Sequence, residues 1–389
     1  MLQRTRIAAG TSVVAAAIGL TSLLSAVTAT ATPARLSGSP VVGHSYVDDN
    51  TTGANTVAAF DRHSDGSLTP EIGSPFAIGG AGLGSGLGSQ GAIQASQDGR
   101  FLLAVDAGSN QISVLRLTAN GAPRLVGRPV SSGGVRPVSI AVSPTGIIYV
   151  ANTGTGGSNY RGFWLTPFGQ LIPIPGATVP VPDGSGVGDI LFNSTGDRLV
   201  ATRVDTQLID SFTVSAFGRL TAANGSPFAA QSEGPFGSEF RPTNPSQLFV
   251  TNAHAGTNAG TVSAFHDGYH GVLTSIGVSP YPDEQTAPCW VEISPDGRYL
   301  FAVNTAAATI SGFSINPNGS LVLLGSTPFR DGTGATDARI SPDGRTLEVT
   351  GGSGHVLSAF AVHGGNLTEL PSSPVALPAN SAPSGLVVN

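Results

Sequence analysis

The amino-acid sequence predicts an all-β protein, a single seven-bladed β-propeller with four antiparallel strands in each blade. Three observations predict it: one unit of about 48 residues recurs seven times, each copy alternates apolar and polar residues, and glycine and proline mark the turns. The chain has 389 residues, including 53 glycines and 28 prolines, and only 11% of its residues are charged. This low charge argues against long helices at the surface.

The first 40 residues predict an export signal followed by a linker. Arg4 and Arg6 precede an apolar run at residues 8–27, and Ala29-Thr30-Ala31 then offers a cleavage site between small residues. We expect a signal peptide at 1–31, a linker at 32–40 and the propeller at 41–389. A membrane anchor is the alternative, but Gly, Thr and Ser dilute the apolar run. We therefore expect a secreted, extracytoplasmic protein with no membrane span once the signal is removed.

The repeated unit is most complete in SPDGRYLFAVN (294–304), TISGFSI (309–315) and GSLVLLGSTPF (319–329). Every copy contains a Gly-x-Leu or a close variant, which starts at Gly66, Gly121, Gly169, Gly218, Gly271, Gly319 and Gly365. One four-stranded sheet of this size cannot bury both of its faces alone, so the copies are expected to pack against one another around a ring. Separate sandwiches are the weaker alternative.

The two ends of the chain predict how the ring closes. The C-terminal PSGLVVN (383–389) matches the first strand of a unit, whereas the segment after Ser39 begins at the second strand. We expect the C-terminal strand to complete the N-terminal blade, which removes free sheet edges.

The inner strands can be aligned on the Ser of SPDG or its equivalent, at Ser96, Ser143, Asn193, Arg241, Ser294, Ser341 and Asn389. Residues two and four places before these positions should point into the central channel, and those one and three places before should pack between blades. Two places back the ring reads Gln94, Ala141, Leu191, Glu239, Glu292, Arg339 and Val387. Four places back it reads Ala92, Ser139, Asp189, Gly237, Trp290, Asp337 and Gly385.

Polar channel residues gather on one side, so we predict Glu239, Glu292, Arg339 and Asp337 as catalytic candidates. Adjacent carboxylates raise one another's pKa, which suits acid and base catalysis, and an arginine can hold a substrate carboxylate with two hydrogen bonds.

Three further residues are predicted to bind substrate: Asp189, Trp290 and His254. Two alternatives to a small-molecule site stay open for the channel. The charged residues could form salt bridges surrounded by water, or the carboxylates could hold a hard divalent cation such as calcium. No other cofactor is expected.

Composition excludes several kinds of chemistry. The 18 basic residues are all arginine, so a Schiff base and a phosphate-loop lysine are excluded. The net charge is −6 and the chain has no runs of basic residues, so no nucleic-acid partner is expected.

Cys289 is the single cysteine, and we expect it to be a buried, inert thiol. The glycines of residues 86–91 match a dinucleotide fingerprint in spacing, but they open no helix and are interpreted as a loop.

Through the repeated segments SPDGRYLFAVN, TISGFSI and GSLVLLGSTPF and the closing PSGLVVN, residues 41–389 resemble the lactonase-type seven-bladed propeller family. That family includes 6-phosphogluconolactonases and carboxymuconate lactonizing (cyclase) enzymes. The shared motifs are blade motifs and specify architecture. Enzymes of that family tend to carry Pro-Arg-His on an inner strand and Asn-Glu after the next strand. Here the matching positions read Pro235-Phe236-Gly237 and Asn252-Ala253, and Gly188 replaces a histidine of the preceding blade. We therefore do not expect 6-phosphogluconolactonase activity.

The sequence thus leaves two hypotheses for function. The first is an exported, lactonase-like propeller that binds, and hydrolyses or cyclises, a small lactone or carboxylate at the channel mouth. The alternative is a non-catalytic scaffold whose long loops, residues 152–161 and 252–260, bind a protein or a cell-wall glycan. We expect a monomer in either case.

Overall fold

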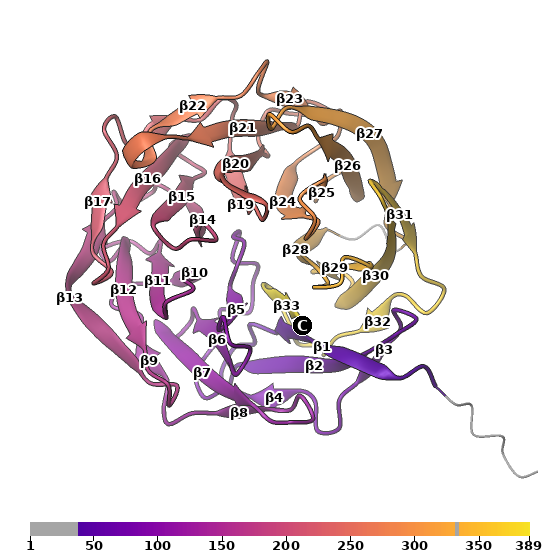
Figure 1. Cartoon of the computed structure of the whole chain (residues 1–389). Coiled ribbons are helices and arrows are strands. Elements are labelled where there is room, and N and C mark those ends of the chain that lie inside the picture. Colours follow the sequence, from indigo (N-terminus) through magenta and orange to yellow (C-terminus); the bar gives the residue numbers. More distant parts are fainter. Residues whose placement is uncertain (1–37, 331–333) are drawn as a thin grey trace, which may run out of the picture. The chain divides into compact units, whose positions relative to one another are not determined.

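The predicted seven-bladed propeller is confirmed in a computed structural model that describes residues 38–330 and 334–389. Seven antiparallel sheets surround a central channel, and residues 39–389 form one compact unit (Figure 1). The expected signal peptide, residues 1–31, lies outside the described residues. Among the described residues, no helix is long and apolar enough to cross a membrane.

Blades are numbered here in chain order, with strands given from the channel outward. Blade 1 consists of β33 (Leu386–Val388), β1 (Val41–Asp48), β2 (Thr56–His63) and β3 (Leu68–Pro70), with β4 (Phe76–Ala77) also on β2. Blade 2 consists of β5 (Ile93–Ala95), β6 (Phe101–Asp106), β7 (Gln111–Leu117) and β8 (Pro123–Leu125), with β9 (Val130–Ser131) on β7. Blade 3 consists of β10 (Pro137–Val142), β11 (Ile147–Asn152), β12 (Asn159–Leu165) and β13 (Leu171–Pro180).

Blades 4 to 7 repeat the arrangement. Blade 4 consists of β14 (Val187–Phe192), β15 (Arg198–Arg203), β16 (Leu208–Val214) and β17 (Leu220–Ala222), with β18 (Phe228–Ala229) on β16. Blade 5 consists of β19 (Pro235–Arg241), β20 (Asn244–Asn252), β21 (Thr261–Asp267) and β22 (Leu273–Ser275), with η1 (Tyr269–Gly271) and β23 (Tyr281–Pro282). Blade 6 consists of β24 (Pro288–Ile293), β25 (Tyr299–Asn304), β26 (Thr309–Ile315) and β27 (Leu321–Pro328). Blade 7 consists of β28 (Ala335–Ile340), β29 (Thr346–Gly351), β30 (Val356–His363) and β31 (Asn366–Glu369), with β32 (Val375–Ala376) on β30.

The SPDG motif recurs because its side chains build the turn that follows an inner strand. In blade 6, the Ser294 hydroxyl donates to Asp296 Oδ1 at 2.6 Å and accepts the Tyr299 N–H at 3.0 Å. Gly297 adopts a φ of +68°, a conformation that side chains disfavour. Ser96 and Ser341 make the same two bonds in blades 2 and 7. The motif therefore fixes the turn by local hydrogen bonds.

The C-terminal strand completes the first blade as expected. β33 pairs antiparallel with β1, with Val387 opposite Tyr46. Beyond the strand, Asn389 exchanges two hydrogen bonds with the His44 backbone: its N–H donates to the His44 carbonyl at 2.9 Å and its Oδ1 accepts the His44 N–H at 2.8 Å. The Asn389 carbonyl accepts a third bond from Arg62 Nη2 at 2.9 Å. Three residues of β33 therefore join blade 1 to the end of the chain.

Deleting residues 386–389 is expected to destabilise the ring strongly. Leu386, Val387 and Val388 are 0%, 5% and 7% exposed, and burial of each such side chain contributes ~1.5–3 kcal/mol. We expect the free energy of unfolding, measured by urea denaturation, to fall by at least about 4 kcal/mol. Val322→Ala, at a half-exposed position, should change it by less than ~0.5 kcal/mol. A deletion no more damaging than this control would contradict the role of β33.

Candidate functional site

Several side chains in the channel accept hydrogen bonds from the backbone N–H groups of the inner strands. Each inner strand is the edge of its sheet, so the N–H groups on its unpaired side need acceptors from outside the sheet. The Ser139 hydroxyl of blade 3 accepts the Ile190 N–H of blade 4 at 3.2 Å. Asp189 of blade 4 repeats the contact one blade on, where Oδ2 accepts the Ser238 N–H at 3.0 Å. Residues four places before the turn therefore connect blade 3 to blade 4 and blade 4 to blade 5.

Asp189 is fully engaged in this network. Its Oδ1 accepts the Ser139 hydroxyl at 3.2 Å, and its Oδ2 also accepts the Ser238 hydroxyl at 2.7 Å. Burial raises the pKa of Asp189 to about 6, although its hydrogen bonds oppose the shift. The residue that we predicted to bind substrate lies between blades 4 and 5, and both of its oxygens contact protein donors.

Asp337 performs the same task between blade 7 and blade 1. Its Oδ2 accepts the N–H of Leu386 at 3.0 Å, and its Oδ1 accepts the N–H of Ala338 at 2.8 Å. Burial raises the pKa of Asp337 to about 7, while the neighbouring Arg339 opposes the shift. The predicted catalytic residue therefore lies at the joint that closes the ring, with its carboxylate bonded to backbone.

Gln90 takes the place of a missing acceptor in blade 5. The residue at the equivalent position is Gly237, and a Cβ there would lie 2.3 Å from the Gln90 Oε1. That Oε1 accepts the N–H of Val291 in blade 6 at 3.1 Å, while Nε2 donates to the carbonyls of Ser238 and Val291 at 3.3 Å each. A side chain that comes from the connection between blades 1 and 2 thus completes the network on the far side of the channel.

The segment that carries Gln90, residues 83–91, crosses one end of the channel, and we call it the plug. The Ser89 hydroxyl donates to the Val138 carbonyl at 2.7 Å, and the Gln90 N–H donates to the Gly188 carbonyl at 2.8 Å. In Figure 1 this segment, just before β5, reaches into the middle of the ring. The glycines at 86, 88 and 91 are thus confirmed as a loop. The sequence contained no signal that this loop would enter the channel.

Trp290 lies against the plug. Its indole Nε1 donates to the Ser89 carbonyl at 3.3 Å, its ring centroid is 5.5 Å from that of Phe236, and it is 4% exposed. The predicted substrate-binding residue therefore packs under the plug. The adjacent Cys289 is a buried free thiol, as expected, and burial raises its pKa to about 11.

Glu292 and Arg339 form an ion pair across blades 6 and 7. Arg339 Nη1 lies 3.1 Å from Glu292 Oε1, and Glu292 Oε2 accepts the Ile340 N–H at 3.0 Å. The side chain of Glu292 is 4% exposed and that of Arg339 is 21% exposed, so solvent reaches the arginine. Arg339 Nε donates to the Leu386 carbonyl at 3.3 Å, whereas its buried Nη2 has no hydrogen-bond partner among the described residues.

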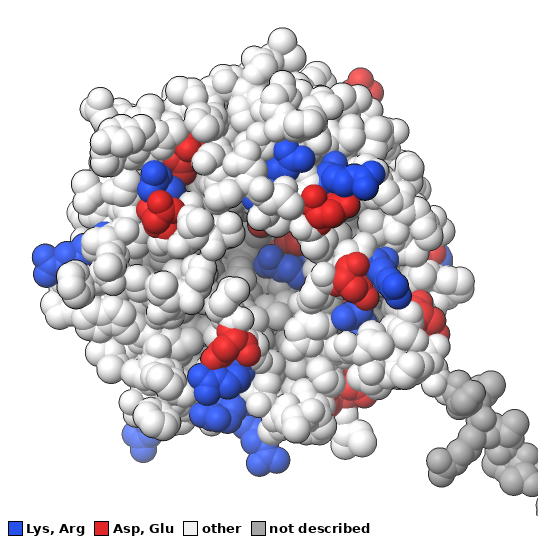
Figure 2. Space-filling model, viewed as in Figure 1, with Lys and Arg blue, Asp and Glu red and all other residues white. Residues whose placement is uncertain are grey.

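Glu239 is the predicted channel carboxylate that makes no side-chain hydrogen bond to a described residue. It is half-buried and close enough to Glu292, Arg339 and Asp189 to interact with their charges. Burial, followed by the negative charge of Glu292, raises the pKa of Glu239 well above its usual value. Figure 2 shows basic and acidic atoms inside the hollow at the centre of the ring. The structure thus brings Glu239, Glu292 and Arg339 together electrostatically.

His254 lies in a different hollow, of about 390 Å³, on the plug side. The hollow is lined by residues of the plug and of both long loops, by Arg136 and by Asp205, and by none of the four predicted catalytic residues. The His254 ring packs over Gly234, where a Cβ would lie 2.5 Å from the ring. The loops at 152–161 and 252–260 contribute Thr153, Thr155 and His254 to this lining.

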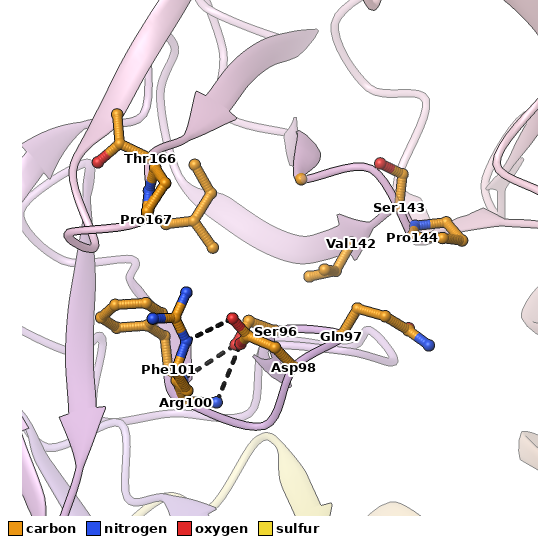
Figure 3. A pocket seen from close by; sticks show the side chains of 12 residues that line it. Ser96, Gln97, Asp98, Arg100, Phe101, Val142, Ser143, Pro144, Thr166 and Pro167 are labelled. Carbon is orange, nitrogen blue, oxygen red and sulfur yellow. Dashed lines mark hydrogen bonds and ion pairs between the residues drawn. The ribbon is translucent and has the colours of Figure 1, made fainter.

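A third hollow, of about 330 Å³, lies between blades 2 and 3 (Figure 3). Asp98 bonds to Arg100 Nε at 2.5 Å and to the Ser96 hydroxyl at 2.7 Å, so the charges in its lining satisfy one another. No predicted site residue lines it.

The channel carboxylates are a poor fit for calcium, which takes six to eight oxygen ligands. Both oxygens of Asp189 and of Asp337 already accept protein hydrogen bonds. Glu292 faces the Arg339 guanidinium, whose charge repels a cation. These contacts leave Glu239 as the one uncommitted predicted ligand.

No protein-family model matches the chain. Among solved structures, it is similar to the periplasmic gluconolactonase of Pseudomonas aeruginosa, with 19% identity, coverage of 89% of this chain and 98% of that one, and a TM-score of 0.71. A protein of Bacteroides uniformis solved as a candidate 6-phosphogluconolactonase matches with 20% identity, coverage of 89% and 99%, and a TM-score of 0.69. The family resemblance expected from the blade motifs is therefore confirmed at the level of the fold.

Replacing Gln90 by Ala is expected to destabilise the ring, because the buried Val291 N–H loses its acceptor. An unsatisfied buried donor costs about 1–3 kcal/mol, which urea denaturation would measure. Gln97→Ala, at an exposed position in the turn between β5 and β6, is the matched control and should change the free energy of unfolding by less than ~0.5 kcal/mol. Equal effects of the two substitutions would show that the plug contributes nothing to the ring.

Stability is expected to fall as the pH rises from about 4 to about 8. Burial raises the pKa of Asp189 to about 6 and those of Asp337 and Glu348 to about 7, so the folded state keeps protons that the unfolded chain releases above pH ~4. The thermal midpoint should therefore be higher at pH 5 than at pH 8. Glu348→Gln should reduce this difference, because that position no longer titrates. A midpoint that rises steadily to pH 8 would contradict the expectation.

Proposed function

We propose that the protein is an exported, lactonase-like propeller that binds a small lactone or carboxylate in the channel and hydrolyses the lactone. One observation carries the proposal: the Arg339 side chain, which is 21% exposed and paired with Glu292, lies near the carboxyl of Glu239, whose pKa is raised. A guanidinium binds the carboxylate of a product and stabilises negative charge on a reacting carbonyl oxygen. A carboxyl beside the reacting atoms can accept a proton and later return it.

Hydrolysis then needs one water molecule and one proton carrier. The ionised form of Glu239 removes a proton from water as the water oxygen adds to the lactone carbonyl carbon, and Arg339 stabilises the resulting oxyanion. When the carbonyl re-forms, the ring C–O bond breaks and the departing alkoxide takes the proton from Glu239. The product is a hydroxy acid, whose carboxylate Arg339 can pair with. Cyclisation of a hydroxy acid is the same sequence in reverse.

The other predicted residues have supporting positions in this proposal. Glu292 holds the Arg339 guanidinium from one side through the 3.1 Å ion pair. Asp189 and Asp337 bond to the backbone of the next blade, and Trp290 packs under the plug, so they position the channel wall without touching the ligand. His254 faces the separate plug-side hollow.

Two observations support the chemical class and the location. The structurally similar protein of Pseudomonas aeruginosa is a periplasmic gluconolactonase, which makes a lactone the first substrate class to test. The N-terminal run after Arg4 and Arg6 has the pattern of an export signal. Arg339 is the only basic residue among the channel positions two and four places before the inner turns, so a phosphorylated lactone is a poorer candidate than an uncharged one.

Glu239→Gln is expected to lower lactone hydrolysis by roughly 10²- to 10⁴-fold, because an amide cannot carry the proton. The assay would measure hydroxy-acid release from a panel of uncharged lactones, with circular dichroism to check folding. Glu233→Gln, an exposed position in the connection just before β19, is the matched control and should keep full activity.

A third variant locates the site. His254→Ala should leave hydrolysis unchanged, because His254 lies in the plug-side hollow. Loss of activity in His254→Ala but not in Glu239→Gln would move the site out of the channel. Equal turnover by the original chain and Glu239→Gln would reject the proposed mechanism.

A further inference from the structure

Within residues 38–330 and 334–389, a second group of side chains that can bind a metal ion lies on blade 1, outside the channel. His44 on β1 is directly opposite Asp61 on β2, and Glu71 follows β3. Ligand atoms of the three residues all lie within 4.8 Å of one another. None of the three belongs to the channel, and the proposed function does not use them.

The two distances from His44 match those between ligands of a tetrahedral ion. His44 Nδ1 lies 3.2 Å from Asp61 Oδ1 and 3.5 Å from Glu71 Oε2. Ligands ~2.0–2.1 Å from a tetrahedral zinc ion are separated by about 3.3–3.4 Å. One imidazole nitrogen and two carboxylate oxygens form a ligand set that zinc accepts, with three protein ligands and a fourth position left for water or a small anion.

An ion-pair network alone explains this arrangement less well. One imidazole N–H can donate to one acceptor, yet two carboxylates converge on the same nitrogen. His44 Nδ1 and Glu71 Oε2 are both buried without a hydrogen-bond partner among the described residues, and the Glu71 side chain is 4% exposed. A buried carboxylate with one unsatisfied oxygen is costly unless a cation or a proton compensates it.

Neighbouring residues fix the orientation of the group. The second oxygen of Glu71, Oε1, accepts a hydrogen bond from Asn120 Nδ2 at 3.2 Å. The His44 ring lies against Gly121, where a Cβ would be 2.3 Å from the ring, and Tyr46 fixes that glycine by donating to its carbonyl at 2.7 Å. Such outer contacts orient the ligands of metal sites.

The group opens onto a groove of about 610 Å³ that leaves room for an additional ligand. Its lining includes His44, Asp61 and Glu71 together with Asn120 and exposed apolar side chains such as Ile72. A small molecule or a water could therefore reach an ion held by the three ligands from the groove side.

We propose that His44, Asp61 and Glu71 form a zinc site with an open fourth coordination position, on blade 1 and separate from the channel. The open position would take water or a small anionic ligand from the groove. Calcium is disfavoured, because it prefers oxygen donors throughout.

The test is zinc retention by the full-length protein. After treatment with EDTA and dialysis against a small excess of Zn²⁺, we expect elemental analysis to find about one zinc per chain. Zinc should also raise the thermal midpoint, and EDTA should reverse the rise, because an ion bound by the folded state stabilises it. Co²⁺ in the same site should give the strong visible absorption of tetrahedral coordination.

Two variants and one control make the result specific. His44→Ala and Asp61→Asn should each lower zinc retention at least tenfold, and Asp61→Asn is a mild change at a partly exposed position. His363→Ala, an exposed histidine on β30, should retain zinc as the original chain does. The proposal is overturned if the protein retains no zinc and its midpoint is unchanged, or if folded Asp61→Asn, checked by circular dichroism, retains as much zinc as His363→Ala does.

Discussion

The hydrogen-bonding requirement at the inner edges of the blades determines much of this structure. A ring of sheets turns each innermost strand edge toward its neighbour, where water cannot serve every N–H group. The chain meets the requirement with side chains from the preceding blade, such as Asp189 and Asp337, and with Gln90 where blade 5 has only Gly237. Polar residues in the channel are therefore needed for the architecture before any chemistry is considered.

This requirement changes how the charged channel residues are understood. Asp189 and Asp337 looked equivalent to Glu239 on a list of inward-facing positions. The structure separates them, because both aspartates contact backbone N–H groups whereas the side chain of Glu239 makes no hydrogen bond to a described residue. Charged channel residues whose side chains are not fully occupied by backbone hydrogen bonds are the better candidates for catalysis. Here they are Glu239 and the ion pair of Glu292 with Arg339.

The sequence predicted the architecture well because the repeat carries it locally. The Ser294-type turn follows from a short motif whose hydrogen bonds lie within a few residues. The C-terminal strand pairs with a distant segment, but its sequence matches the first strand of a unit, which was enough to predict the pairing. The candidate sites were harder, because they depend on contacts between distant segments. The placement of Gln90 beside Gly237 depends on the path of a glycine-rich loop with no periodic pattern. The His44 group joins residues 17 and 10 positions apart, on β1, on β2 and just after β3, and the strand register, with His44 opposite Asp61, brings the first two together.

The closure of blade 1 by β33 also has a kinetic consequence. His44 and Asn389, which bond across that joint, are 345 residues apart. The inner edge of the first blade therefore remains open until the end of the chain has been synthesised, and contacts of such long sequence separation form slowly. During that interval β1 presents an unpaired strand edge that another chain could join. The same few residues that finish the ring thus also determine how long a newly made chain is exposed to aggregation.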